Sequence, residues 1–257
     1  MMKKEMRVFF TALMFYTRIP CPSWVDHSEE YINKATRYFP LIGWIVGVVV
    51  ALVVYGLHFI FPNPVCIILS LATGILMTGA FHEDGFADVC DGFGGGWTKE
   101  KILDIMKDSR VGAYGVVGLI VIFILKISAL TELMNINIWF CLKAIVLAHV
   151  ISRFAAVTMI FTHEYSREDA TSKIRPIAKK LTTANFCISS IWLIPAFFLF
   201  QNWWVVLSIV PVYLMKMYLA KYFKKWIGGY TGDCLGATQQ VTEIVTLLFC
   251  LGLCRFI

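Results

Sequence analysis

The sequence predicts an all-α fold, a polytopic bundle of six to seven transmembrane helices in a single integral membrane domain over residues 1–257, with cytoplasmic loops forming the site. Hydrophobic residues make up 58% of the chain and charged residues only 16%. In soluble domains, roughly 45–50% of the residues are apolar and about 25% are charged. Several apolar stretches also approach the ~20 residues that cross the hydrocarbon of a bilayer. These observations predict that the excess apolar surface lies in lipid.

The first element is a short apolar run over residues 8–16. It lacks a small-residue cleavage site, which argues against a signal peptide and favours an interfacial helix. The last run is the weakest span, because Glu243 and Arg255 interrupt it and charges inside a span are costly. The predicted spans cover residues 41–61, 65–81, 112–130, 136–157, 186–200, 203–220 and 241–257.

Lysine and arginine are distributed unevenly between the connections. Six precede residue 41, and four, five and three lie in 82–111, 162–185 and 221–240, whereas the alternate connections have none. The positive-inside rule therefore predicts a cell (inner) membrane protein whose N-terminus and polar loops are cytoplasmic. The net charge of +6 is not gathered in a basic run, so no nucleic-acid partner is expected.

The densest polar segment follows the second predicted span. If it is helical, Asp84, Asp88 and Asp91 stand at i, i+4 and i+7 on one face. Like charges stacked in this way repel, so a compensating cation is expected, and carboxylate oxygens select Mg²⁺, Mn²⁺ or Ca²⁺. The alternative is a solvated loop whose acids balance its own lysines.

Groups suited to phosphate come directly after these acids. Gly94 and Gly95 lie in a glycine run whose backbone N–H groups could approach an anion. Lys107, Asp108 and Arg110 then place cations before the next span. Acids for a metal, together with glycines and bases for phosphate, are the parts of a phosphoryl-transfer site.

A second glycine-rich loop covers residues 228–237 and contains Gly232, Asp233 and Gly236. A turn between helices explains the glycines, but it does not explain an acid at the mouth of a span. A functional role and a structural role are therefore equally open for this loop.

For two arginines, a functional role and a structural role are likewise both open. Arg18 ends the N-terminal helix and could bind phosphate or anchor the chain at lipid headgroups. Arg153 lies four residues after His149 on one helix face, where both side chains could be packing or snorkelling residues.

Five motifs in one order resemble the cobalamin synthase (adenosylcobinamide-GDP ribazoletransferase) family. The resemblance runs from about residue 6 to the C-terminus, although 131–205 matches only in hydropathy apart from Ser152 and Arg153. The motifs are FYTRIP at 15–20, RYFPLIG at 37–43, HEDGFADVCDG at 82–92, MKDSRVGAYG at 106–115 and GGYTGDCLGA at 228–237.

The resemblance implies the last assembly reaction of coenzyme B12, with Mg²⁺ required. A hydroxyl of α-ribazole, or of its 5′-phosphate, attacks the cobinamide-linked phosphorus of adenosylcobinamide-GDP, and GMP leaves. These substrates and the lipid bilayer are the implied partners, with a homo-oligomer left open. The implied roles are metal binding by Asp84, Asp88 and Asp91, a general base at His82 or Glu83, diphosphate contacts from Arg18, Lys107 and Arg110, and Asp108 and Asp233 orienting those cations or holding a second metal.

The sequence leaves two alternative functions to consider, a related phosphotransferase and a transporter. A CDP-alcohol phosphotransferase also uses Asp-Gly-x-x-Ala runs, but its pattern needs an arginine directly after the alanine, and here Asp88 follows Ala87. A transporter with an acidic cation site would place acids near the bilayer midplane and often show an internal repeat. The sequence shows neither, so transport is the least favoured function.

Overall fold

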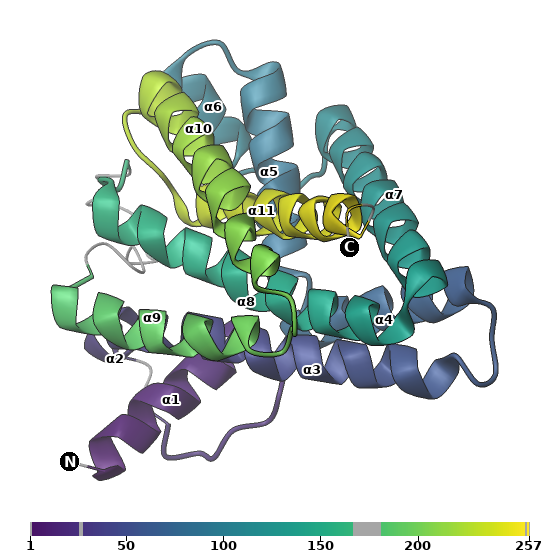
Figure 1. Ribbon diagram of the computed structural model, residues 1–257. Coiled ribbons are helices and arrows are strands. Elements are labelled where there is room, and N and C mark those ends of the chain that lie inside the picture. Colours follow the sequence, from purple (N-terminus) through teal and green to yellow (C-terminus); the bar gives the residue numbers. More distant parts are fainter. Residues whose placement is uncertain (1, 26–27, 167–180, 255, 257) are drawn as a thin grey trace.

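The computed structural model describes residues 2–25, 28–166, 181–254 and 256 (Figure 1). These residues form helices and connections, with one isolated bridge between Tyr165 and Tyr230. The helices are α1 (Met2–Tyr16), α2 (Glu29–Ala35), the 3-10 helix η1 (Thr36–Tyr38), α3 (Phe39–Leu57), α4 (Asn63–Thr78), α5 (Phe81–Gly95), α6 (Lys99–Ile105), α7 (Ala113–Ile136), α8 (Ile138–Thr162), α9 (Thr183–Phe197), the 3-10 helix η2 (Trp203–Ser208), α10 (Ile209–Ile227) and α11 (Gly232–Leu253).

Five of the helical segments described are long and apolar enough to cross a membrane, and α4 with α5 forms a sixth candidate that is bent by 92°. The all-α membrane bundle is thus confirmed. The span predicted over 186–200 is the short helix α9, with 15 residues. The weak last span is α11, which begins at Gly232 and therefore includes residues 232–237 of the second glycine-rich segment.

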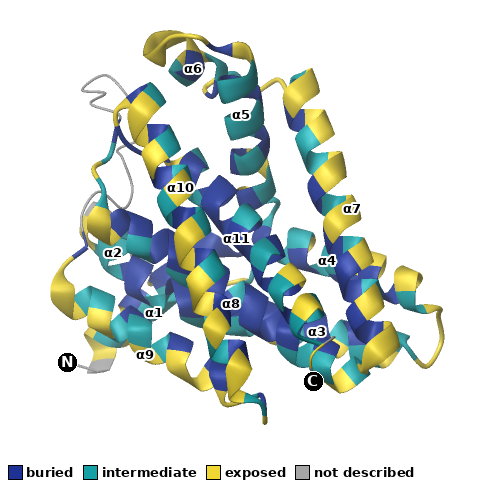
Figure 2. Cartoon of the chain, turned by 45° about the horizontal axis from the view of Figure 1, so that its top comes forward, coloured by how far each residue is buried: buried dark blue, intermediate teal, exposed yellow. Residues whose placement is uncertain are grey.

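Helix α8 lies at the centre of the bundle and α7 and α10 lie at its periphery (Figure 2). In the apolar part of α8, 78% of the residues are buried, against 28% in α7 and 28% in the continuous segment of η2 and α10. The exposed side chains of α7 and α10 are largely aliphatic or aromatic. Without lipid these faces would be large apolar patches of a kind that soluble monomers rarely expose.

Glycines allow two pairs of helices to approach closely. A Cβ atom on Gly43 of α3 would lie 2.5 Å from the carbonyl oxygen of His149 in α8. A Cβ atom on Gly236 of α11 would lie 3.1 Å from the carbonyl oxygen of His82 in α5. Small residues permit this backbone approach in membrane bundles, so α3 packs on α8 and α5 packs on α11.

The bend between α4 and α5 comes from two residues in the left-handed region, Gly79 (φ 66°) and Ala80 (φ 58°). Glycine adopts this conformation at no steric cost, whereas alanine in it is strained by roughly 1–3 kcal/mol. The turn sends α5 away from the axis of α4 toward α6 (Figure 1). One face of α5 is consequently left outside the bundle.

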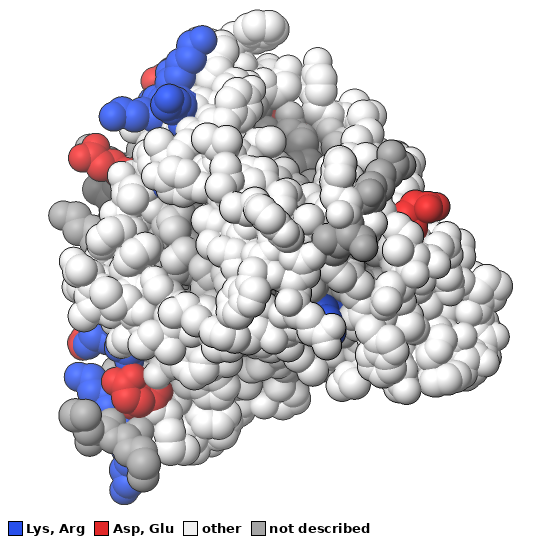
Figure 3. Space-filling view, viewed as in Figure 1, with Lys and Arg blue, Asp and Glu red and all other residues white. Residues whose placement is uncertain are grey.

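Charged side chains are concentrated at one end of the bundle. Figure 3 shows most of them along the left edge, near the C-terminal ends of α8 and α10 and around α1 and α2, with a further acidic patch at the right edge, while most of the visible face is white. This distribution agrees with the uneven loop charges in the sequence.

Candidate active site

Acids from two helices meet at the outer face of α5. Asp84 is exposed and Asp88, one turn later, is half-buried. Gly85 lies between them, and a Cβ atom there would be 3.0 Å from the Cα of Asp233. Because Gly85 has no side chain, the first turn of α11 brings Asp233 beside α5. The structure therefore brings Asp233 next to the turn of α5 that lies between Asp84 and Asp88.

Thr231 fixes the start of α11. Its hydroxyl oxygen accepts a hydrogen bond from the backbone N–H of Cys234 at 3.3 Å, which is an N-cap. The same hydroxyl lies 3.3 Å from Oδ2 of Asp233, to which it donates. The threonine thus orients both the helix and its first acid.

Asp91 has a different environment from Asp84 and Asp88. It is buried, its Oδ2 accepts from the N–H of Gly112 at 2.7 Å, and its Oδ1 accepts from the N–H of Gly115 at 2.9 Å. These N–H groups belong to the start of α7, where the first N–H groups have no acceptor within the helix. The helix dipole also favours an anion there. Asp91 therefore caps α7, and its predicted role as a metal ligand stays a prediction.

The predicted phosphate-binding cations lie on exposed segments near α5. The Arg18 side chain crosses Gly79, and its backbone N–H donates to the carbonyl of Met77 at 2.7 Å. Lys107 and Arg110 are exposed in the segment that precedes α7. That segment ends at Gly112, which Asp91 holds against α5.

Asp108 orients one of these cations. Its carboxylate accepts from Nη2 of Arg110 at 2.7 Å and from Nε at 3.1 Å. These hydrogen bonds lower the pKa of Asp108 to about 2. Arg110 remains 87% exposed, so its outer N–H groups can still bind an anion.

The glycines do not form the anion-binding loops that the sequence predicted. Gly94 and Gly95 belong to the last turn of α5, where backbone N–H groups are bonded within the helix. Gly94 instead makes room for the ring of Tyr114. Gly236 is a packing contact with α5, and Gly232 opens α11 with no atom near its Cβ position.

The two candidate bases point into the bundle. His82 is 2% exposed, is stacked on Phe39 with ring centroids 5.6 Å apart, and finds no hydrogen-bond partner for Nε2 among the described residues. Glu83 accepts at Oε1 from Nε2 of Gln240 at 2.9 Å, and its buried Oε2 has no partner within the same described part of the chain. A base must reach the proton that it removes, so their predicted role stays a prediction.

Arg153 also belongs to the interior. It is 1% exposed, and its Nη1 donates to the carbonyl of His149 at 3.0 Å. The guanidinium lies over the Phe39 ring, 5.7 Å from its centroid. Arg153 lines a small pocket together with His82, Glu83 and Glu243, and its predicted role in substrate binding stays a prediction.

An ion pair in the bundle accounts for Glu243 in the last predicted span and for Lys126, which lies inside the span predicted over 112–130. Lys126 of α7 lies 2.6 Å from Oε1 of Glu243 in α11, and both side chains are at most 5% exposed. Nζ of Lys126 also donates to Oε1 of Gln240 at 2.7 Å, and Nε2 of Gln239 donates to Ser152 at 3.1 Å. The sequence indicated this pair only through the presence of a charged residue inside each of two predicted spans.

Asp84 and Asp88 offer two carboxylates to a divalent cation. Among the described residues, no three His, Cys, Asp or Glu side chains are grouped closely enough to hold a metal ion. Mg²⁺ is usually held by one or two carboxylates, with waters and substrate phosphates completing its shell. Asp84 and Asp88 are adjacent, accessible carboxylates, so they fit a Mg²⁺ ion that substrate helps to bind.

Comparisons with known proteins agree over nearly the whole chain. The family model described as cobalamin-5-phosphate synthase matches residues 8–251. The chain is 43% identical to an adenosylcobinamide-GDP ribazoletransferase of Shewanella frigidimarina, over 97% of this chain and 95% of that protein. It is 44% identical to a protein of the same name from Leptospira interrogans, over 98% and 96%. No solved structure matches.

Proposed function

The chain belongs to the cobalamin-5-phosphate synthase family, and from this premise we propose that the outer face of α5 is the active site of its transferase reaction. The protein is an adenosylcobinamide-GDP ribazoletransferase of the final cobalamin assembly step. It joins adenosylcobinamide-GDP to α-ribazole or its 5′-phosphate and releases GMP. The observation that carries the location is the contact of Asp233 with Gly85, between Asp84 and Asp88, on a helix that has the exposed Arg18 near its start.

The reaction requires neutralisation of negative charge on a diphosphate. We assign Asp84 and Asp88 as the carboxylates that hold Mg²⁺, and the chemistry that this ion supplies when bound is charge neutralisation at phosphate oxygens. Asp233 lies against Gly85 between them and completes the acidic face. Carboxylates alone would repel the substrate, so the neighbouring cations are equally necessary.

The cations bind and orient the diphosphate in this proposal. Arg18 lies at the N-terminal end of α5, and Lys107 and Arg110 lie before α7, so the substrate is contacted from two directions. Asp108 keeps the Arg110 guanidinium in one orientation, which reduces the entropy lost on binding. Asp91 holds the start of α7 and with it the segment that carries both cations.

In the transfer step, a substrate hydroxyl attacks the cobinamide-linked phosphorus. A new P–O bond forms, the bond from that phosphorus to the GMP oxygen breaks, and the hydroxyl proton is released. The arrangement contributes mainly through position and electrostatics, as in other phosphoryl transfers. We propose that this face lies on the cytoplasmic side of the inner membrane, which the Lys and Arg counts of the connecting segments support.

The test is turnover by the purified protein in detergent or lipid. Adenosylcobinamide-GDP and α-ribazole or its 5′-phosphate are supplied with Mg²⁺ or with EDTA, and GMP release is followed. We expect Mg²⁺-dependent GMP together with a cobalamin product. A folded sample that releases no GMP would contradict the activity, and undiminished turnover in EDTA would contradict the metal assignment.

A further inference from the structure

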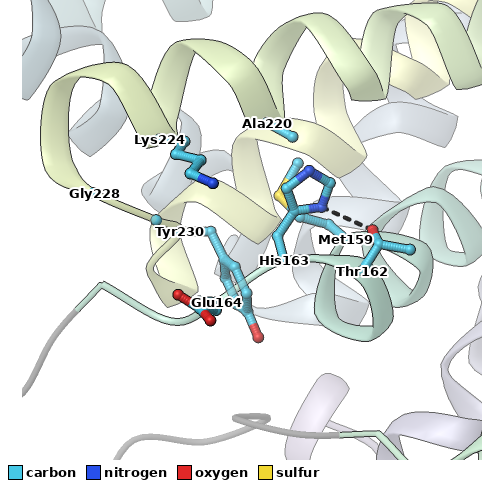
Figure 4. A pocket seen from close by; sticks show the side chains of 9 residues that line it. Met159, Thr162, His163, Glu164, Ala220, Lys224, Gly228 and Tyr230 are labelled. Carbon is cyan, nitrogen blue, oxygen red and sulfur yellow. Dashed lines mark hydrogen bonds between the residues drawn. The ribbon is translucent and has the colours of Figure 1, made fainter.

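A second polar pocket lies apart from the acidic face, between the C-terminal ends of α8 and α10 (Figure 4). Its volume is ≈ 180 Å³, several times the roughly 30 Å³ that one water occupies in the liquid. The polar residues that line it include Thr162, His163, Glu164, Lys224 and Tyr230. None of these has a role in the diphosphate site described above.

One wall of the pocket is held by backbone hydrogen bonds. The N–H of Tyr230 donates to the carbonyl of Glu164 at 3.1 Å, and the N–H of Ser166 donates to the carbonyl of Tyr230 at 2.8 Å. Gly229 approaches the Glu164 carbonyl so closely that a Cβ atom would collide with it. The α10–α11 loop and the end of α8 therefore form a fixed wall.

Two lysines lie at the His163 side of the pocket, Lys224 in its lining and Lys216 behind Thr162. Nζ of the buried Lys216 donates to Oγ1 of Thr162 at 2.7 Å, and that hydroxyl is 2.7 Å from Nδ1 of His163. Burial lowers the pKa of His163, and the positive charges of Lys216 and Lys224 lower it further. In Figure 4 the Lys224 ammonium points toward the His163 ring, whereas the Glu164 carboxylate lies lower in the view.

Lys224 has no acidic partner among the residues that the structure describes. The Thr162 hydroxyl donates to the carbonyl of Thr158 at 2.6 Å, so the groups of the pocket that suit a phosphate are the Lys224 ammonium and the His163 imidazole, which can donate hydrogen bonds to its oxygens. A phosphomonoester has a charge of about −1.5 to −2 at pH 7. The pocket therefore matches a terminal phosphate better than a neutral group.

We propose that this pocket binds the 5′-phosphate of α-ribazole 5′-phosphate, with Lys224 and His163 contacting its oxygens. The inference rests on the proposed function, in which the substrates have two separate phosphate groups. The diphosphate belongs to the cations around α5. The loop that forms the pocket wall at Tyr230 continues within three residues to Asp233 at the acidic face, so one loop contributes to both places.

The test is substrate selectivity in a matched pair of variants. Lys224→Gln removes the pocket charge, and Lys225→Gln makes the same change at the next residue, whose ammonium lies over the Trp226 ring instead. Hydrogen bonds to charged groups correspond to roughly 10- to 100-fold in binding. We expect Lys224→Gln to raise the ratio of KM for α-ribazole 5′-phosphate to KM for α-ribazole by about that factor, and Lys225→Gln to leave it unchanged.

A second variant, His163→Asn, should shift the same ratio in the same direction. An unchanged ratio in both pocket variants, or an equal change for the two substrates, would overturn the proposal. GMP release by the wild-type protein in the same assay separates this result from a failure of the proposed function.

The same anion chemistry could come from a lipid headgroup. The assay is therefore repeated in nanodiscs of phosphatidylcholine with and without phosphatidylglycerol. We expect the selectivity change of Lys224→Gln in both lipids. A change that needs phosphatidylglycerol and affects both substrates equally would identify a headgroup site and overturn the substrate site.

Discussion

The acids on the outer face of α5 differ from the acids inside the bundle in what surrounds them. Asp84 is exposed and Asp88 half-buried, near the segments that hold Arg18, Lys107 and Arg110. Asp91 lies on the same helix but is buried, with hydrogen bonds to both oxygens. Their spacing places the three acids on one face of α5. Their different burial separates Asp84 and Asp88, which substrate can reach, from Asp91, which caps α7.

Glu243 extends the comparison to α11. An acid in the interior of a membrane helix is what a transporter would need, but here Lys126 neutralises it at 2.6 Å. A buried charge is tolerated when it is paired and hydrogen-bonded. The interior acids therefore hold helices together, whereas the outer acids remain accessible to substrate.

The largest effect should come from Asp88→Asn, which removes one of the two carboxylates proposed to hold Mg²⁺. Losing such charge stabilisation costs about 10²–10³ in rate, so GMP release should fall to about 1% or less of wild type while the melting temperature is retained. Asp104→Asn, the same change on the exposed face of α6, is the control and should keep its activity. A Asp88→Asn protein with wild-type turnover would refute the assignment.

The next largest effect should be a loss of stability when the buried ion pair of Lys126 and Glu243 is broken. Lys126→Met leaves Glu243 buried without its cation, and breaking a buried pair in this way costs about 3–5 kcal/mol. Thermal unfolding in detergent measures it. The double variant Lys126→Met/Glu243→Gln should recover much of the loss, because no charge is then left unpaired. Equal melting temperatures for the wild type and Lys126→Met would show that the pair does not stabilise the fold.

Asp91→Asn should have a smaller effect. An asparagine keeps one oxygen for the start of α7 but loses the charge, so we expect a loss of about 1.5–3 kcal/mol in unfolding free energy. Turnover per folded molecule should fall much less than in Asp88→Asn. If the two variants lost turnover equally, at equal folded fraction, Asp91 would act in the chemistry as well.

The smallest effect should come from Asp108→Asn, which frees Arg110. We expect KM for adenosylcobinamide-GDP to rise a few-fold with no change in melting temperature, since exposed pairs contribute little to stability. The pKa of Asp108 is lowered from 3.8 to about 2, so its contribution is complete above 3.8 and is lost as the pH falls through about 2. Between about pH 6 and 9, a pH profile of KM should therefore show no titration from this group. A KM equal to that of the wild type would rule out the orienting role.

Local patterns in the sequence predicted the helical part of the site. The spacing of Asp84, Asp88 and Asp91 indicated one face of a helix, and α5 confirms the helix. The separate tasks of these acids could not be predicted, because the partner of Asp91 lies 21 and 24 residues later at Gly112 and Gly115. Spacing along a helix reports direction, not depth of burial.

Other features depend on contacts between distant segments. In the sequence, Lys126 and Glu243 are charged residues inside two different predicted spans. Only the packing of α7 on α11 brings them together as an ion pair. The bend at Gly79 and Ala80 was also unforeseen, because alanine rarely adopts a left-handed conformation. That bend is what exposes the acidic face of α5.

The most direct test of the division between outer and interior acids is Mn²⁺ binding followed by electron paramagnetic resonance. Mn²⁺ accepts the same oxygen ligands as Mg²⁺, and adenosylcobinamide-GDP is present to complete its shell. We predict an immobilised Mn²⁺ signal in the wild type and in folded Asp91→Asn, and its loss in Asp88→Asn. A signal that persists in Asp88→Asn and disappears in Asp91→Asn would contradict the account.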